Sequence, residues 1–577
     1  MQGSRCLLAD RAFSSLVIGA AAFVTSSFLL PWHDWPDSQS GLRYAYLLDQ
    51  FCDAFRHGMV YPRWLPNAFG GYGYPTFVYY QPGFFFWCLP LGLLLGDVPQ
   101  AMYLSVLGLL VLGAAGAYRL CALLAGRTCG LFGAILFLLT PYLYVNLYVR
   151  GDLSELMAML IVPWPWYFFV RLASGENATR PGVATGVLFL GAATAAVIYS
   201  HPATALFLLG SLVLASLSLT ACRAVGRQTL FRLVLGLALG VVLAIPYWFP
   251  ALTLRDRVAH ETAMEGYFTP SNHSVYADQF FSRRWMFGYS MPGREDAMPM
   301  SLGLPHFAFA AAGAFAQRRQ AMFRVMFVLY LGLVLFTTPV CGFIWDRVLW
   351  LRYVQFPWRV LSVTATLQVA CACGLHGAIA SLGRLRHVVL GLACFGIIGW
   401  QIEQFSANRE RLTDVTRRLE HHRRTLRDEF RSYAATDEFT PTTAARIAEV
   451  GPRQSRPLLE SRQPAGAAAL VIEGDEYRFR CVVPRGAASQ VVINQLWFPG
   501  WKARLNGRLL TDAELEQQRL PDGRMRLLLS NTEEHELSAW YGGPPDAARD
   551  VKVMVIALAL LALGLVLALR ANPRVPK

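Results

Sequence analysis

Three short segments of the chain carry charged side chains directly beside long apolar runs, where an unpaired charge is costly. The first follows the apolar run at 13–30 and reads PWHDWPDS, with Asp34 and Asp37. A carboxylate here could act as a general base or a metal ligand; the alternative is a helix cap or a surface turn. Arg63, further along the same loop, could contact a phosphate or anchor the loop at the membrane interface.

The second segment, YVRGDLSE, forms a turn between two apolar runs and contains Arg150, Asp152 and Glu155. Glu155 would lie in the first turn of the following helix and face the same way as Asp152. One interpretation is an ion pair between Arg150 and a carboxylate that holds the turn together. The other is that Arg150 binds an anionic lipid head group while a carboxylate orients a substrate or a metal.

The third segment, LRYVQFPWRVL, contains Gln355 and opens another apolar run. Arg352 and Arg359 could both reach one phosphate, because a guanidinium suits bidentate phosphate binding. The alternative is that the Trp and Arg side chains only anchor the helix end at the interface. His201, in YSHPATA, lies in a tight turn between two apolar runs and could be structural or functional.

Apolar runs long enough to cross a bilayer, about 20 residues each, position these segments. The 577 residues are 54% hydrophobic and only 16% charged, against roughly a quarter charged in soluble proteins. About a dozen crossings are predicted, at 13–30, 100–118, 131–147, 156–171, 182–199, 203–220, 231–250, 301–316, 322–339, 359–380, 387–401 and 551–570. The sequence has no Walker loop, Rossmann fingerprint, serine-protease arrangement or HExxH motif, so neither ATP-driven transport nor proteolysis is supported.

The net charge of +14 comes from arginines that fall in short clusters between apolar runs. This placement argues against nucleic-acid binding and is typical of cytoplasmic loops. The clusters occupy alternate loops: Arg5 and Arg11; Arg119 and Arg127; Arg171 and Arg180; Arg223, Arg227 and Arg232; Arg318, Arg319 and Arg324; Arg384 and Arg386; and Arg570, Arg574 and Lys577. We therefore expect both termini in the cytoplasm, with residues 31–99, 251–300, 340–358 and 402–550 outside.

The apolar stretch from Phe77 to Leu95 cannot be a simple crossing, because every later loop would then change sides. It contains Pro82 and Pro90 and is rich in aromatic residues, which favour the membrane interface. We predict a re-entrant or interfacial helix on the outer side. The alternative is an ordinary crossing, with another crossing assigned wrongly.

Residues 402–464 form a charged linker that is predicted to be helical, and the pattern then changes. From 465 to 550, short alternating stretches separated by Gly and Pro turns predict an outer β-sandwich, with LNGR as a hairpin signal. Trp497, Phe498 and Trp501 are expected to be at least partly packed. Residues 551–577 are the expected last transmembrane helix and cytoplasmic tail.

Several motifs in order along the chain resemble a bacterial membrane family called 6-pyruvoyl-tetrahydropterin-synthase-related: GMVYPRW, GGYGYPTFVYYQPG, TPYLYVNLYVRGDLSE, SHPATA, QFPWR and WFPGWKARLNG. The resemblance implies a GT-C-like membrane glycosyltransferase, with residues 1–401 as its transmembrane domain. Such enzymes use polyprenyl-phosphate sugars and have an acidic residue in the first outer loop, which matches Asp34 or Asp37. Related chains often have a histidine shortly after this acidic residue, whereas SQSGLRY here has none. The stretch Phe77–Leu95 is similar to the juxtamembrane helices of that fold.

The sequence therefore predicts a glycosyltransferase in a bacterial inner membrane that moves a sugar from a polyprenyl-phosphate donor to a glycan, lipid or protein acceptor on the outer face. Asp34 or Asp37 is the expected base. The expected substrate-binding residues are Arg63, Arg150, Asp152, Glu155, His201, Gln355 and Arg359. No cofactor is required by the pattern, and a divalent metal stays open. The alternatives are a lipid or polysaccharide transporter or flippase, and a non-catalytic scaffold for envelope assembly.

Overall fold

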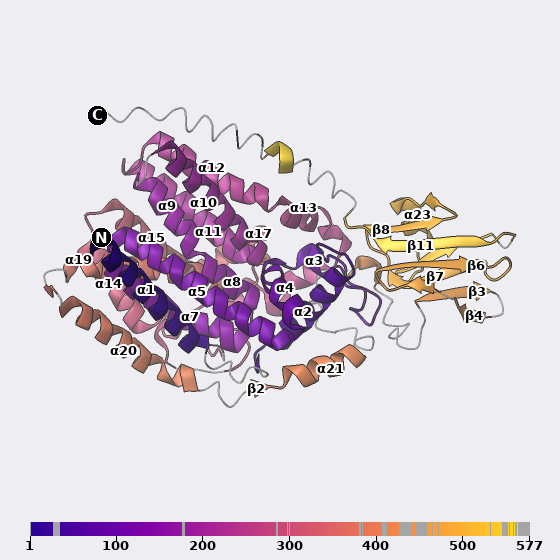
Figure 1. Ribbon diagram of the computed structural model, residues 1–577, viewed down its shortest axis with the longest axis horizontal. Coiled ribbons are helices and arrows are strands. Elements are labelled where there is room, and N and C mark those ends of the chain that lie inside the picture. Colours follow the sequence, from indigo (N-terminus) through magenta and orange to yellow (C-terminus); the bar gives the residue numbers. More distant parts are fainter. Residues whose placement is uncertain are drawn as a thin grey trace.

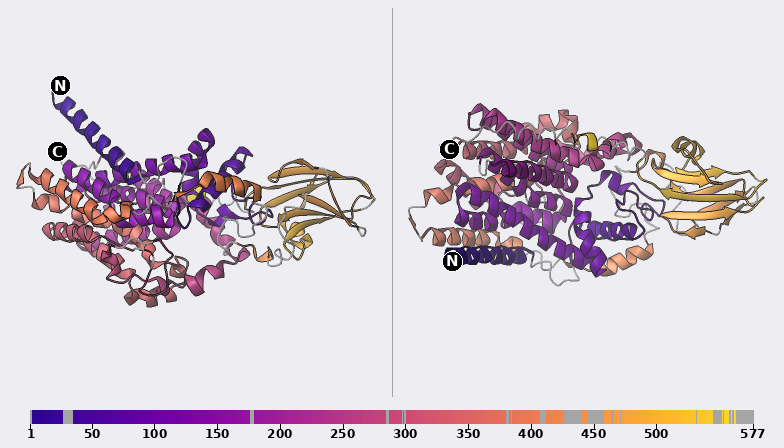
Figure 2. Two further views of the ribbon diagram at one scale, coloured as in Figure 1. Left: turned by 90° about the horizontal axis from the view of Figure 1, so that it is seen from below. Right: turned by 45° about the horizontal axis from the view of Figure 1, so that its top comes forward.

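The computed structural model describes most of the chain: residues 2–26, 35–175, 179–283, 287–296, 298, 300–379, 382–383, 385–406, 412–425, 440–444, 458–463, 466–470, 472–530, 532–544, 552, 554–557, 559 and 562. A large helical region is followed by a β region at one end of the long axis (Figures 1 and 2). The first described end of the chain, in α1, lies at the opposite end from the β region (Figure 1).

The helices of the first half are α1 (Gln2–Ser26), α2 (Gly41–Arg56), α3 (Thr76–Tyr79), α4 (Gly83–Leu95), α5 (Val98–Ala125), α6 (Arg127–Leu138), α7 (Pro141–Tyr144), the π-helix η2 (Val145–Arg150), α8 (Leu153–Ile161), α9 (Pro163–Ala173), α10 (Arg180–Ser200), α11 (Pro202–Ala221), α12 (Arg227–Leu243) and α13 (Ile245–Thr253). Short 3-10 turns occupy much of 255–281. The later helices are α14 (Leu304–Ala316), α15 (Ala321–Phe336), α16 (Gly342–Arg347), α17 (Leu349–Arg352), the 3-10 turn η9 (Pro357–Val360), α18 (Leu361–Ala372), α19 (Leu375–Ala378), α20 (Leu385–Ser406) and α21 (Val415–Thr425).

Within the described residues, four helical segments are long and apolar enough to cross a membrane: Val98–Ala125, Leu153–Ala173, Pro181–Ser200 and Pro202–Ala221. Three bent helix pairs raise this number to seven if each pair is one span, with bends of 44°, 63° and 79°. Pro141, Pro246 and Pro339 lie at or next to these breaks, where a proline cannot continue the backbone hydrogen bonding of the preceding helix. The chain is therefore a largely helical protein with several membrane-length apolar helices, and the dozen crossings stay a prediction.

The stretch Phe77–Leu95 forms parts of two helices, α3 and α4, separated at Tyr80–Pro82. Helix α4 has 13 residues, which at 1.5 Å per residue gives about 20 Å, shorter than the hydrocarbon core of a bilayer. By itself α4 is therefore too short for a crossing. Its place relative to the membrane stays a prediction.

The β region contains two antiparallel sheets that share one apolar core. Their orders are β10-β7-β3-β4 and β5-β6-β11-β8-β9, and β1 (Trp35–Pro36) pairs separately with β2 (Leu412–Thr413). The strands are β3 (Leu459–Gln463), β4 (Gly466–Ala469), β5 (Ile472–Gly474), β6 (Arg478–Val483), β7 (Gln490–Leu496), β8 (Trp501–Leu505), β9 (Arg508–Leu509), β10 (Arg524–Leu528) and β11 (His535–Tyr541), with helix α23 (Asp512–Gln518) before β10.

Alternation along the strands builds this core. In β6, Phe479, Cys481 and Val483 point inward, whereas Arg478, Arg480 and Val482 are exposed, as the two-residue period of a strand requires. Trp497, Phe498 and Trp501 are buried, as predicted. The first strand begins at Leu459, before the predicted start at 465.

The loop between α2 and α3 packs against the β region. Gln495 donates to the carbonyls of Pro66 and Gly71 at 3.0 and 3.1 Å and accepts from the indole of Trp64 at 3.1 Å. Gly73, at φ +84°, lies so close that a Cβ would collide with Trp64 and Gln495. Helix and sheet regions are therefore joined by a specific polar and aromatic contact.

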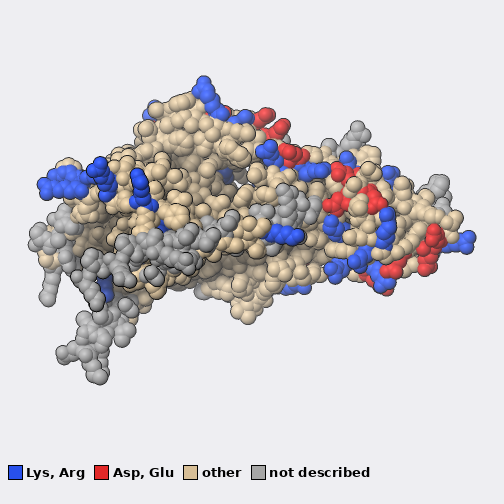
Figure 3. Space-filling model, turned by 90° about the horizontal axis from the view of Figure 1, so that it is seen from above, with Lys and Arg blue, Asp and Glu red and all other residues tan. Residues whose placement is uncertain are grey.

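Charged side chains are unevenly distributed on the surface. Figure 3 shows Lys and Arg without Asp or Glu at the end away from the β region, whereas acidic side chains gather over and near the β region. The predicted orientation, with the arginine-rich loops in the cytoplasm, stays a prediction.

Candidate functional site

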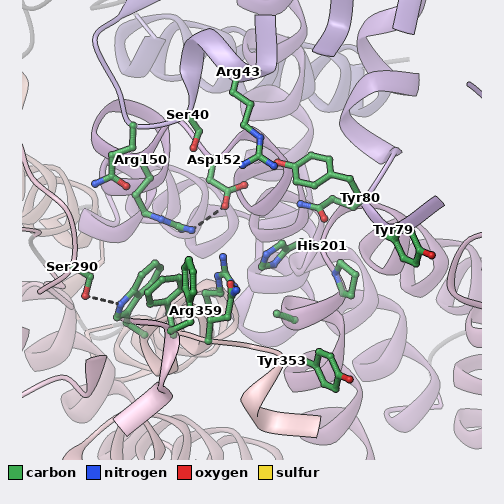
Figure 4. A pocket seen from close by; sticks show the side chains of 18 of the residues that line it. Ser40, Arg43, Tyr79, Tyr80, Arg150, Asp152, His201, Ser290, Tyr353 and Arg359 are labelled. Atoms are coloured by element: carbon green, nitrogen blue, oxygen red, sulfur yellow. Dashed lines mark hydrogen bonds and ion pairs between the residues drawn. The ribbon is translucent and has the colours of Figure 1, made fainter. Parts of the chain in front are cut away.

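A cavity of about 600 Å³ opens where the ends of several apolar helices meet the loops on the side of the β region. Its polar lining comes from Gln39, Ser40, Arg43, Gln81, Arg150, Asp152, His201, Arg255, His260, Ser290, Gln355 and Arg359. Its aromatic lining comes from Tyr79, Tyr80, Tyr267, Phe268, Tyr289, Tyr353, Phe356 and Trp358. Figure 4 shows Arg43, Asp152, His201 and Arg359 around its centre.

The turn after η2 places two of the predicted carboxylates. Gly151 adopts φ +59°, the left-handed conformation that ends a helix at little cost only for glycine. Asp152 then caps α8 by accepting from the backbone N–H of Glu155 at 3.1 Å. A Cβ on Gly151 would also collide with Ser38. This glycine therefore lets the segment before α2 approach the turn.

The segment before α2 and this turn are joined through their backbones. Gln39 N–H donates to the carbonyl of Val149 at 3.0 Å, and Ser40 N–H donates to that of Arg150 at 2.8 Å. Two of the three sequence segments are therefore direct neighbours.

Glu155 is fully buried; it does not line the cavity itself but contacts two residues that do, Arg150 and Arg359. Tyr142 and Ser362 donate to its Oε1 at 2.7 and 2.6 Å. Arg150 donates to its Oε2 at 2.7 Å, and the Nε atom of Arg359 lies 3.6 Å from the same oxygen. Its charge is thus compensated by one close and one more distant guanidinium.

Asp152 is the carboxylate that faces the cavity. Tyr44 donates to its Oδ1 at 2.8 Å, and Arg150 donates to its Oδ2 at 2.9 Å. Burial alone would raise the pKa of this carboxyl, but the positive charge of Arg150 and its neighbours outweighs burial and holds the pKa below the usual range. Asp152 is therefore ionised at neutral pH.

The third segment, LRYVQFPWRVL, includes η9 and also lines the cavity. Arg359 donates to the carbonyl of Val354 at 2.6 Å and to Gln355 Oε1 at 3.3 Å. Gln355 adopts φ +66°, an uncommon conformation for a residue with a side chain, and this turns the chain into η9. The ring of Trp358 lies 4.4 Å from the guanidinium of Arg150, a cation–π contact.

His201 lies between α10 and α11 and caps α11. Its Nδ1 accepts from the backbone N–H of Thr204 at 3.3 Å, so the proton of the neutral ring is on Nε2, 3.9 Å from Glu155. Burial lowers the pKa of His201 to about 4, although the nearby carboxylates oppose this shift. The ring is therefore neutral at physiological pH.

Three predicted site residues lie elsewhere or outside the described residues. Asp34 is outside the described residues. Asp37 is exposed and does not belong to the cavity lining. Arg63 is also absent from that lining; it donates to the carbonyl of Pro246 at 2.5 Å and lies over the ring of Tyr61. Arg63 therefore has a packing contact in the structure, and its phosphate contact stays a prediction.

Several residues of the site were not predicted. Arg43, on α2, lines the cavity and lies 4.9 Å above the ring of Tyr80; among the described residues it has no hydrogen-bond acceptor or carboxylate partner. Tyr80 donates to Tyr44, which in turn donates to Asp152. Arg43 gave no signal in the sequence, because α2 is an amphipathic helix with several other charged residues, among which one arginine does not stand out.

The residues fit a resident metal ion poorly. Ligand atoms of Asp152, Glu155 and His201 all lie within 4.8 Å of one another, a suitable set for a divalent cation. However, Arg150 already donates to both carboxylates, and Arg359 lies beside them. A metal ion would have to displace a buried guanidinium, so no metal is assigned here.

No family model and no curated protein matches the sequence, so the pterin-synthase-related name has no support from these comparisons. Among solved structures, the oligosaccharyltransferase AglB from Archaeoglobus fulgidus, solved with an inhibitory peptide and a dolichol-phosphate, is similar at 12% identity and a TM-score of 0.47. The match covers 69% of this chain and 56% of AglB. The arabinofuranosyltransferase AftD from Mycobacteria is similar at 18% identity and a TM-score of 0.44, over 70% of this chain and 27% of AftD.

By name, the first of these proteins transfers oligosaccharides and the second transfers arabinofuranose. This chain spans little more than half of the first and about a quarter of the second. At TM-scores below 0.5, neither similarity establishes a shared activity.

Proposed function

We propose that this protein is a GT-C-like membrane glycosyltransferase that moves a sugar from a polyprenyl-phosphate donor to an acceptor on the outer face of a bacterial inner membrane. The observation that carries the proposal is the cavity itself. It brings together four arginines from distant segments, Arg43, Arg150, Arg255 and Arg359, with Asp152 as the one carboxylate among its described lining residues. Such an excess of positive charge beside apolar helices suits an anionic lipid head group.

The arginines differ in how far their charge is already compensated. Arg150 donates to both Asp152 and Glu155, and Arg255 lies 3.3 Å from Asp256. Arg359 approaches Glu155 only to 3.6 Å, and Arg43 has no carboxylate partner among the described residues. Arg43 and Arg359 are therefore the guanidiniums that would bind the donor phosphate and stabilise it as it leaves.

Asp152 is the proposed base because it is ionised and faces the cavity. It would accept the proton of the acceptor hydroxyl while that oxygen bonds to the anomeric carbon and the bond from this carbon to the phosphate oxygen breaks. The polyprenyl phosphate leaves with the bond's electron pair, and the sugar is transferred with inversion. The sequence-based proposal of Asp34 or Asp37 is kept as the competing assignment.

Binding of a polyprenyl phosphate to the purified protein in lipid nanodiscs tests the donor site. Arg43→Ala and Arg359→Ala should each weaken binding about tenfold or more, the equivalent of about 1.4 kcal/mol. Arg294→Ala is the matched control, because Arg294 is exposed and outside the cavity lining. Unchanged affinity in both cavity variants would overturn the donor site.

Transfer from a panel of polyprenyl-phosphate sugars, measured in membranes, tests the chemistry. Asp152→Asn should abolish sugar transfer while donor binding persists. Asp37→Asn should leave sugar transfer unchanged. Full transfer by Asp152→Asn together with its loss in Asp34→Asn or Asp37→Asn would return the base to the first outer loop. Movement of the lipid across the bilayer without any transfer would instead favour a flippase.

A further inference from the structure

A second buried polar cluster lies beside the cavity and involves residues that the proposed reaction does not use. Ser290 Oγ is its centre. It lies 2.9 Å from His273 Nδ1 and 2.9 Å from Asp296 Oδ2, and it accepts from the indole N–H of Trp358 at 3.3 Å. The dashed line from Ser290 in Figure 4 marks this last contact. His273 is 1% and Ser290 3% exposed, so water cannot replace these partners freely.

The hydrogens in this cluster can be counted. His273 Nε2 lies 2.5 Å from the carbonyl oxygen of Tyr267, which can only accept, so Nε2 carries a hydrogen. If His273 is neutral, its Nδ1 is then an acceptor. If Asp296 is ionised, its Oδ2 is an acceptor too. Ser290 has one hydrogen and can satisfy only one of these two atoms.

With an ionised aspartate and a neutral histidine, two lone pairs would therefore face each other across 2.9 Å. Moving the histidine hydrogen to Nδ1 does not help, because a lone pair on Nε2 would then face the Tyr267 carbonyl. One additional proton resolves the conflict. On Asp296 it lets Asp296 donate to Ser290 and Ser290 donate to His273; on His273 it lets the imidazolium donate to Ser290 and Ser290 donate to Asp296.

We propose that His273, Ser290 and Asp296 share one proton beyond an ionised aspartate and a neutral histidine, and that this proton holds Trp358 in place 5.9 Å from the guanidinium of Arg359, one of the two proposed phosphate-binding arginines. The second part of this statement rests on the proposed function. Burial favours the placement of this proton on Asp296, because it raises the pKa of the Asp296 carboxyl and lowers the pKa of the His273 imidazole. Among the described residues, the other titratable or charged groups that act on this pair are Arg359, which acts on His273, and Tyr267, which interacts with Asp296.

The cluster reaches the cavity through two aromatic rings. Trp358 donates to Ser290 and lies 4.4 Å from the guanidinium of Arg150. Phe356 stacks on Trp358 with centroids 4.8 Å apart and contacts the ring of His273 at 4.7 Å. As the pH rises and the proton is lost, Ser290 would be repelled by one of its two acceptors, and its hydrogen bond from the Trp358 indole would weaken. The affinity for an anion should therefore decrease at alkaline pH.

The proton itself can be detected without any substrate. Two spectra of the protein in nanodiscs at neutral pH locate the proton, and one of them should show it. Infrared spectroscopy would show a protonated carboxyl band that is absent from Asp296→Asn. Histidine NMR would show an imidazolium signal that is absent from His273→Gln. The matched control is Asp278→Asn, because Asp278 is exposed and pairs with Arg294; it should change neither spectrum. An ionised Asp296 together with a neutral His273 would overturn the proposal.

The positioning role is tested by the affinity for polyprenyl phosphate as a function of pH. Wild type and Asp278→Asn should lose about tenfold or more in affinity through an alkaline step. Asp296→Asn should lack this step, because its amide donates to Ser290 at every pH and can keep accepting from the backbone N–H groups of Met291 and Met298. The same alkaline step in Asp296→Asn would overturn the positioning role. Absence of binding at every pH in wild type would overturn the proposed function instead, and the spectroscopic result would still decide the shared proton.

Discussion

The buried charge of Glu155 can be removed with little change of shape by Glu155→Gln. The glutamine can still accept from Tyr142 and Ser362, which donate to Oε1 in the wild type. It cannot compensate Arg150, 2.7 Å away, or Arg359, 3.6 Å away. Arg150 keeps Asp152 at 2.9 Å, whereas Arg359 loses its carboxylate.

Removal of one partner from a buried ion pair destabilises by about 3–5 kcal/mol, because the remaining charge is left uncompensated. Since Asp152 still offsets part of this charge, we expect the lower end, about 3 kcal/mol. Equilibrium unfolding in mixed micelles measures this difference. The matched control is Glu516→Gln, which removes an equally close partner of Arg257 at 2.8 Å, but at the surface; an exposed pair contributes about 0–1 kcal/mol.

The comparison of the two glutamines isolates burial, since both parent ion pairs have nearly the same length. A loss for Glu155→Gln no larger than that for Glu516→Gln would show that the cluster is hydrated in solution, and the reasoning on buried charge would be wrong. Loss of cooperative unfolding in either variant would be visible in the shape of the transition and would identify a misfolded variant.

Three other outcomes follow from the structure. Gly73→Ala should destabilise the contact between the helical and β regions and increase proteolysis between them. The control is Gly58→Ala, also at positive φ but with no atom within 4 Å of its Cβ, which costs only the backbone strain of about 1–2 kcal/mol. An equal effect of the two variants would refute the predicted collision at Gly73. Burial lowers the pKa of His201 from 6.5 to about 4, so that, as the pH is lowered, the unfolded chain binds a proton before the folded protein does. Stability should therefore fall as the pH decreases from 6.5 to 4. His201→Asn should remove this part of the pH dependence of unfolding. Single cysteines at Ser432 and Asn572, in a cysteine-free background, should react with impermeant reagents from opposite sides of the membrane; labelling of both from one side would overturn the orientation.

The sequence was informative about the site where charge meets apolar surface. Arg150, Asp152 and Glu155 stood out because a charge next to a membrane-length apolar run needs compensation. The structure shows the local ion pairs that were the alternative interpretation, and it also brings Arg359 to the same carboxylate. The two interpretations therefore describe the same residues, with Arg150 mainly paired and Arg359 less so.

Other parts of the site could not be read from the sequence. Arg43 lines the cavity and Tyr44 reaches Asp152 only because α2 runs beside the turn at Gly151, which depends on packing between distant segments. The left-handed conformation of Gln355 has no signal, since residues other than glycine adopt it only where their surroundings require it. The β strands were predictable because their two-residue alternation is local, whereas the pairing of the sheets is not.

The contact between the β region and the loop that follows α2 has a geometric consequence. Gln495 and the backbone of Leu496 bind this loop at 2.7–3.1 Å, and Tyr477 of the β region donates to Asp53 at the end of α2 at 2.8 Å. The same loop leads directly to Tyr79 and Tyr80 in the cavity wall. Attachment at two separate places prevents the β region from swinging on its linker. The distance between the sheets and the cavity would therefore be constant. If the sheets bound one end of a molecule, the length of that molecule would decide which of its groups reaches the cavity.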